Sequence, residues 1–167
     1  NAINRVLGVG GGGLMTIGQM SEIVVLAAIP LVGRLHSRKA LLGVGIAAYA
    51  ARMALFAYTD SMATAILGVS LHGLCFGCFI FVAFMVVDEE TTADVRASAQ
   101  NLFNLVIVGV GIIVGSWLST SVVGAWAMVP ATAEALEGMA PERMDWTRLF
   151  SVPMWAALVC LVLLLAF

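Results

Sequence analysis

Five stretches of this chain are apolar over the length needed to cross a lipid bilayer, and this feature constrains the fold more than any other. A membrane-spanning helix needs about 20 mainly apolar residues. We predict five such helices, at residues 14–33, 40–58, 63–87, 95–123 and 149–167. The expected fold class is therefore an all-α integral membrane bundle.

The composition excludes a soluble domain. Of the 167 residues, 62% are hydrophobic and only 11% are charged, and the mean hydropathy is +1.05. Soluble domains are about 45–50% apolar and about 25% charged. The net charge of −2 and the absence of a basic run give no indication of a nucleic-acid partner. The lipid bilayer is the expected surrounding, in the cell (inner) membrane.

The connections between the spans suggest an orientation. The loop at residues 34–39 carries Arg34, Arg38 and Lys39, so the positive-inside rule predicts that it is cytoplasmic. Alternation then places the loop at residues 124–148 outside. The basic residues number four inside against three outside. Before the fourth span, Thr91 and Asp94 have the spacing of a capping box.

Polar side chains inside the first span indicate a functional surface. Thr16, Gln19 and Glu22 are three residues apart and share a helix face. A carboxylate is costly in hydrocarbon, and such residues usually face a cavity or a partner. Glu22 is therefore a candidate for binding and releasing a proton, and Gln19 offers donors and an acceptor to a polar solute. The alternatives are a Glu22 near the outer interface or one permanently paired with Arg52 as a strut.

The other polar residues in the spans allow several interpretations. Arg52 lies near the end of the second span, where it can snorkel to the outer headgroups or serve as a structural or coupling ion pair. Asn104 is a further candidate for binding or coupling. His72, Cys75 and Cys78 would spread over about 120° of a helix, which makes a poor tetrahedral metal site. We therefore expect no metal, no cofactor and no catalytic constellation, so the protein is not expected to be an enzyme.

Several motifs together resemble the nucleoside:proton symporter family of the major facilitator superfamily. They are GQMSE in the first span, RLHSRKALLG in the following loop, LHGLCF in the third span, and VDEETTADVRASAQNL at the entry to the fourth. The resemblance covers about residues 13–167. It implies that the five spans are helices eight to twelve of a twelve-helix transporter, in its C-terminal six-helix half. Residues 1–167 would then be a partial domain, lacking helix seven and the N-terminal half, which is the expected partner within the same protein.

The resemblance also implies roles for particular residues. Gln19 and Glu22 match a glutamine and a glutamate that line the central cavity of the family and take part in substrate binding or proton coupling. Phe76 matches an aromatic residue suited to stacking on a base. Gly77 stands where the family has an aspartate, so the role of that carboxylate is not carried over. We hypothesise that His72 supplies a titrating or hydrogen-bonding group instead.

Two classes of function follow. The first is a secondary active transporter that carries a nucleoside or similar polar solute with protons by alternating access, its two halves rocking about a midplane site. A sugar or organic-acid symporter of the same superfamily is the alternative within that class, since fold does not determine substrate. The second class is a membrane sensor or scaffold that binds without transporting.

Overall fold

The structure is a computed structural model, and it describes residues 11–33, 35–130 and 142–167. Five of its helices are long and apolar enough to cross a membrane within these ranges, which confirms the predicted all-α membrane bundle. Residues 1–10, residue 34 and residues 131–141 of the predicted outer loop lie outside the described residues.

Three of the five spanning helices are regular throughout, and π-helical turns interrupt the other two. The first two are α2 (Gly11–Val32) and α3 (Arg38–Tyr58). The third span consists of α4 (Met62–Ser70), α5 (His72–Cys75), the π-helix η1 (Phe76–Phe81) and α6 (Val82–Glu90). The fourth consists of α7 (Arg96–Asn104), η2 (Leu105–Val110), α8 (Gly111–Trp117), η3 (Leu118–Gly124) and α9 (Ala125–Ala127). The fifth is α10 (Trp146–Ala166).

A short β-hairpin joins the fourth and fifth spans, where the sequence predicted only a loop. Strands β1 (Met128–Pro130) and β2 (Glu142–Met144) pair antiparallel, with Met128 opposite Met144. The backbone N–H of Asp145 then donates to the carbonyl of Ala127 at 2.8 Å. These bonds fix the approach of the chain to α10.

Side-chain caps determine where three of the spans begin. The hydroxyls of Ser37 and Ser61 accept bonds from the N–H groups of Ala40 and Ala63, and the carboxylate of Asp145 accepts one from Arg148. Such caps satisfy N–H groups that have no partner within the helix. The capping box predicted at Thr91 and Asp94 is wrong: α7 begins without a side-chain cap, and the Thr91 hydroxyl donates to the carbonyl of Val87 at 2.7 Å.

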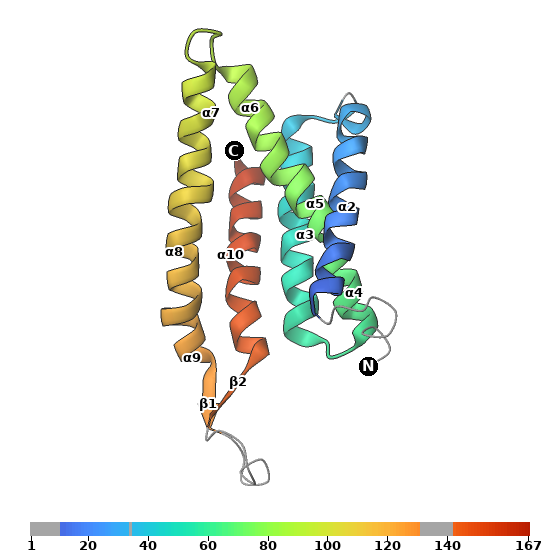
Figure 1. Cartoon of the computed structure of the whole chain (residues 1–167), viewed down its shortest axis with the longest axis vertical. Coiled ribbons are helices and arrows are strands. Elements are labelled where there is room, and N and C mark those ends of the chain that lie inside the picture. Colours follow the sequence, from blue (N-terminus) through green and yellow to red (C-terminus); the bar gives the residue numbers. More distant parts are fainter. Residues whose placement is uncertain (1–10, 34, 131–141) are drawn as a thin grey trace.

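The helices pack in two unequal groups (Figure 1). Helices α2, α3 and α4–α6 lie together, and α10 packs most extensively against α3. A small core of buried Ile29, Leu41, Cys78 and Val82 joins α2, α3, η1 and α6. The long helix α7–α9 stands apart, touching α6 at one end and α10 at the other, with none of its apolar window buried.

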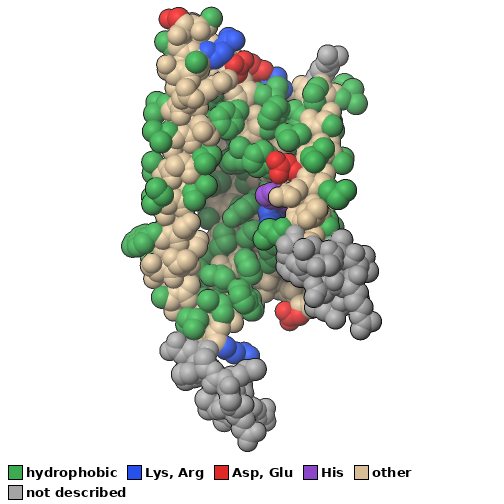
Figure 2. Space-filling model, viewed as in Figure 1, with side chains coloured by type: hydrophobic (Ala, Val, Ile, Leu, Met, Phe, Trp, Pro, Cys, Tyr) green, Lys and Arg blue, Asp and Glu red, His purple; other side chains and the backbone are tan. Residues whose placement is uncertain are grey.

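The α2–α3 and α6–α7 turns lie at the same end of the bundle (Figure 1), and charged side chains gather there (Figure 2). The guanidinium of Arg38 donates to both carboxylate oxygens of Glu89, from Nε at 3.2 Å and from Nη2. Asp88 contacts Arg96 at 3.4 Å and accepts a bond from Gln100 at 2.9 Å. Both turns are therefore linked to the C-terminal end of α6.

Candidate functional site

The site begins with a close crossing of α2 and α5. A Cβ built on Gly73 would lie 2.4 Å from the carbonyl carbon and oxygen of Ser21, so only glycine fits at this contact. The N–H of Gly73 donates to the Ser21 hydroxyl at 3.0 Å, and that hydroxyl donates to the Gly18 carbonyl at 2.8 Å. Small residues allow such backbone contact between membrane helices. The crossing places the side chains beside Ser21 and Gly73 against each other.

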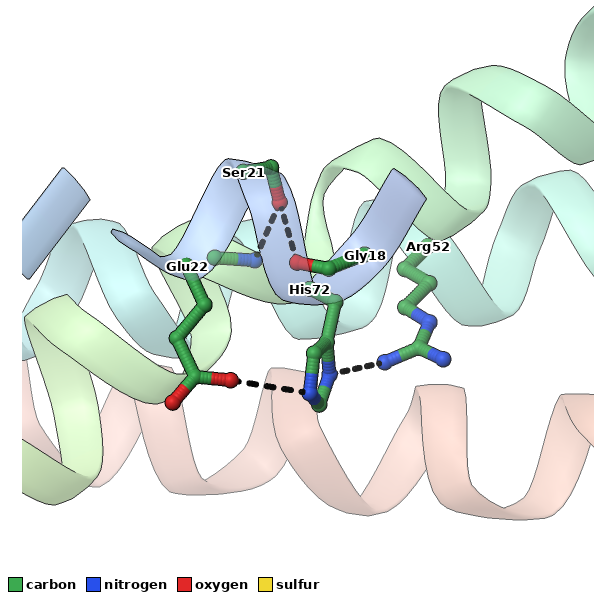
Figure 3. A network of polar contacts seen from close by, with 6 residues as sticks. Gly18, Ser21, Glu22, Arg52 and His72 are labelled. Atoms are coloured by element: carbon green, nitrogen blue, oxygen red, sulfur yellow. Dashed lines mark hydrogen bonds and ion pairs between the residues drawn. The ribbon is translucent and has the colours of Figure 1, made fainter. Parts of the chain in front are cut away.

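Those neighbouring side chains are Glu22 and His72, and Arg52 completes a network with them (Figure 3). Oε2 of Glu22 lies 3.6 Å from Nε2 of His72, and Nη1 of Arg52 lies 2.9 Å from Nδ1 of the same ring. The side chains of Glu22 and His72 are 24% and 37% exposed. Three helices, α2, α5 and α3, thus bring two charged groups to opposite sides of one imidazole.

Arg52 is directed into the bundle. Its guanidinium carbon lies 5.5 Å from the centre of the Phe56 ring, a cation–π contact. Its Nε is buried and has no hydrogen-bond partner among the described residues. In this arrangement His72 lies between Arg52 and Glu22. The two charged residues are therefore linked through the imidazole and not by the direct ion pair that the sequence analysis considered.

A cavity of about 460 Å³ adjoins the network, between α3, α5–η1 and α10. Its walls are mainly apolar, with the polar groups of Tyr49, Arg52 and His72 on one side. Phe76 also lines it, 36% exposed, with its ring centre 6.4 Å from that of His72. Figure 2 shows a hollow on this face of the molecule, with hydrophobic side chains within it.

The predicted site residues therefore separate into two sets. Glu22, His72 and Arg52 are in contact, and Phe76 shares the cavity wall with the latter two. Gln19 lies on α2 one turn before Glu22 with an exposed side chain, and Asn104 is exposed on α7, the helix that stands apart. Neither Gln19 nor Asn104 lines the cavity in the described structure.

Sequence reasoning missed Ser21, Gly73 and Tyr49 as parts of the site. Ser21 and Gly73 join α2 to α5, and Tyr49 lies one helical turn before Arg52 on the cavity wall. Two signals were available in the sequence. Gly73 is a small residue within a span, which permits close helix approach, and Ser21 precedes Glu22 while Gly73 follows His72. Which helix faces another could not be derived from that adjacency.

Gly77 occupies a position at which a side chain has no space. A Cβ built there would lie 2.6 Å from Cγ1 of Val25 on α2. The volume that an aspartate would need is therefore filled by a valine of the neighbouring helix. The structure gives a physical reason why this position carries glycine in this chain.

We expect Gly77→Asp to destabilise the full-length protein by about 1–3 kcal/mol, the usual cost of overpacking. Val25→Ala removes the methyl group that would clash, so the double variant should recover most of the loss. The measurement is the thermal unfolding midpoint in detergent, with Val25→Ala alone as the control. An equal loss in the two backgrounds would contradict the steric explanation.

Comparisons with known proteins agree on one family. The model described as nucleoside H+ symporter matches residues 3–167. The chain is 32% identical to the xanthosine permease of Escherichia coli (strain K12) over 110 residues, 64% of this chain and 26% of the permease. It is 32% identical to the nucleoside permease NupG of the same organism over 114 residues, 66% of this chain and 27% of NupG.

Solved structures agree with these matches. A crystal structure of the nucleoside transporter NupG superposes with a TM-score of 0.76 at 25% identity, over 92% of this chain and 36% of that chain. A mutant of the same transporter gives a TM-score of 0.77 at 26% identity. The chain spans about a quarter of the length of the curated relatives that it matches.

Proposed function

The chain belongs to the nucleoside H+ symporter family, and from that premise we propose that the protein containing it transports nucleosides together with protons. The observation that carries the proposal is Glu22, a carboxylate in the middle of an apolar helix that contacts His72. Intramembrane carboxylates in contact with polar partners are typical of proton pathways in transporters. The family match also favours nucleosides over sugars or organic acids.

The cavity suits the apolar part of such a solute. Its volume of about 460 Å³ falls in the range of small-molecule sites. Phe76 offers an aromatic face on which a base can stack, and Tyr49, Arg52 and His72 offer polar groups at one side. In this proposal Phe76 holds the base, and Gln19, exposed beside Glu22, binds the polar part of the solute.

We propose that these helices are the eighth to the twelfth of a twelve-helix transporter that works by alternating access. Helix α7–α9 is strongly apolar, yet its window is unburied in the described structure. The hollow beside it is bounded by α3, α5–η1 and α10. A further apolar helix from the same protein, the proposed seventh, would cover both surfaces, and the N-terminal half would enclose the solute. The turn with Arg38 and Lys39 is proposed to face the cytoplasm.

Uptake by the full-length protein tests the proposed function. We expect cells that lack their own nucleoside transport to accumulate radiolabelled uridine when they express it. Uptake should be faster at acid than at neutral external pH and should be abolished by an uncoupler, because the proton gradient drives the cycle. Xylose and lactate serve as control solutes for the alternative substrate classes. Binding of uridine without accumulation would contradict transport and favour a sensor.

A further inference from the structure

The imidazole of His72 lies between two charged groups, and the geometry of these two contacts indicates which ring nitrogen carries the proton. We propose that Arg52 is a positioning residue that holds His72 as the neutral Nε2–H tautomer, with that N–H directed at Glu22. This role rests on the proposed function and deepens it, because it names the group that donates to Glu22, the proposed coupling carboxylate. Arg52 acts only through His72 and needs no contact with the solute.

The direction of the Arg52–His72 bond follows from the chemistry of arginine. A guanidinium has five donors and no acceptor, and it stays charged at all physiological pH values. Nη1 of Arg52 lies 2.9 Å from Nδ1 of His72, so Nδ1 must be the acceptor and carries no proton. A neutral imidazole then has its proton on Nε2. An imidazolium would set one N–H against another at this distance, so the bond from Arg52 requires the neutral ring.

The other ring nitrogen faces the carboxylate. Nε2 of His72 lies 3.6 Å from Oε2 of Glu22, somewhat beyond a direct hydrogen bond. At this separation an N–H on Nε2 is attracted to the carboxylate, whereas a lone pair there would be repelled, and an approach of a few tenths of an ångström would form the hydrogen bond. An ionised Glu22 accepts the Nε2–H, whereas a protonated Glu22 no longer offers a charged acceptor. The Nε2–H therefore becomes available to the solute when the proton is bound.

The surroundings of the ring support this assignment. Glu22 comes from α2, and α3 contributes Arg52 and the phenol of Tyr49. Helix α5, which carries His72, contributes the Cys75 thiol. Among the cavity-lining residues of α10, Cys160 is the titratable one. Phenol and thiol groups are neutral in their protonated forms. Arg52 and Glu22 are thus the two charges that decide the state of His72.

The nitrogen signals of the ring provide a direct test in the full-length protein. We expect histidine labelled with 15N to show His72 as the Nε2–H tautomer in the wild type, with its signals assigned by their loss in His72→Gln. Arg52→Met should release Nδ1, so that the ring gains the other tautomer or takes up a proton as the pH falls. Arg52→Lys, which keeps a charged donor, should preserve much of the wild-type signal. A wild-type ring with its proton on Nδ1 would overturn the proposal.

Transport provides the second readout. We expect Arg52→Met to lower acid-driven uridine uptake about tenfold or more, as for loss of a hydrogen bond to a charged group, and to shift its pH profile. Arg52→Lys should restore part of both. Arg148→Met is the matched control, because Arg148 also lies 5.5 Å from an aromatic ring, that of Trp126, and is near the start of α10, outside the cavity lining. An unchanged pH profile and unchanged ring signals in Arg52→Met would overturn the inference, whereas a wild type that transports no nucleoside would contradict only the proposed function.

Discussion

Replacing Glu22 with Gln is expected to abolish acid-stimulated nucleoside accumulation by the full-length protein. Glutamine has nearly the same shape and can still accept a bond from His72 Nε2, but it cannot take up or release a proton. Proton binding and nucleoside binding should then be uncoupled. Couplings between two ligands typically change affinity by about 5–150-fold, so uridine affinity should depend on pH in the wild type by a factor of this order and be constant in Glu22→Gln.

The measurement compares uridine binding and uptake at acid and neutral pH in both proteins. Glu89→Gln is the matched control, because Glu89 is also a carboxylate beside a nitrogen donor, Arg38, but lies at the loop end of the bundle. Its substitution should leave the pH dependence of binding in place. Persistent acid-stimulated accumulation in Glu22→Gln would show that another group carries the proton, and would remove Glu22 from the coupling role.

The spanning helices could be predicted from the sequence because hydropathy alone determines which segments enter a bilayer. The family could be recognised from the motifs around Gln19, Arg38 and Arg96, and the family match confirms it. The ends of the helices were harder to predict from the sequence. The fourth helix continues to Ala127, beyond the predicted residue 123, because Gly124 does not interrupt it. The hairpin after it depends on pairing between residues 12 to 16 positions apart. No local sequence pattern in this loop predicts that pairing.

The site could be predicted only residue by residue. An isolated Glu22, Arg52 or His72 in an apolar span already indicates a polar partner, because each is costly without one. The sequence could not show that His72 lies between the other two, since that depends on the α2–α5 crossing at Gly73 and Ser21. It also could not show that Asn104 lies on a helix remote from the network, or that Val25 fills the space beside Gly77.

The π-helical turns are a further feature without a sequence signal. Segment η1 begins at Phe76, directly after the short helix that carries His72, so its wider turn affects where Phe76 meets the cavity wall. Such turns are uncommon and often occur at functional sites. Their position here joins the network to the proposed base-stacking residue within a single span.

The second large effect is expected from Gly73→Ala, a change of one methyl group that leaves every charged side chain unaltered. The new Cβ would lie 2.4 Å from the Ser21 carbonyl and 2.6 Å from the N of Glu22, and these backbone atoms cannot rotate away. Helices α2 and α5 must separate, which we expect to cost about 1–3 kcal/mol or more. Separation also weakens the bond from Gly73 to Ser21 and moves His72 away from Glu22.

The test measures the thermal unfolding midpoint and acid-driven uridine uptake of the full-length protein. Gly43→Ala is the matched control, because its Cβ would lie 3.8 Å from side-chain atoms of Leu161 and Leu164, an ordinary contact. Both changes gain the same helix propensity, about 1 kcal/mol, so any difference between them reports the crossing. If Gly73→Ala is as stable and as active as Gly43→Ala, the crossing does not hold Glu22 and His72 together. If it loses both stability and coupling, the position of the carboxylate is determined by backbone contact between two helices, because the charged side chains themselves are unchanged.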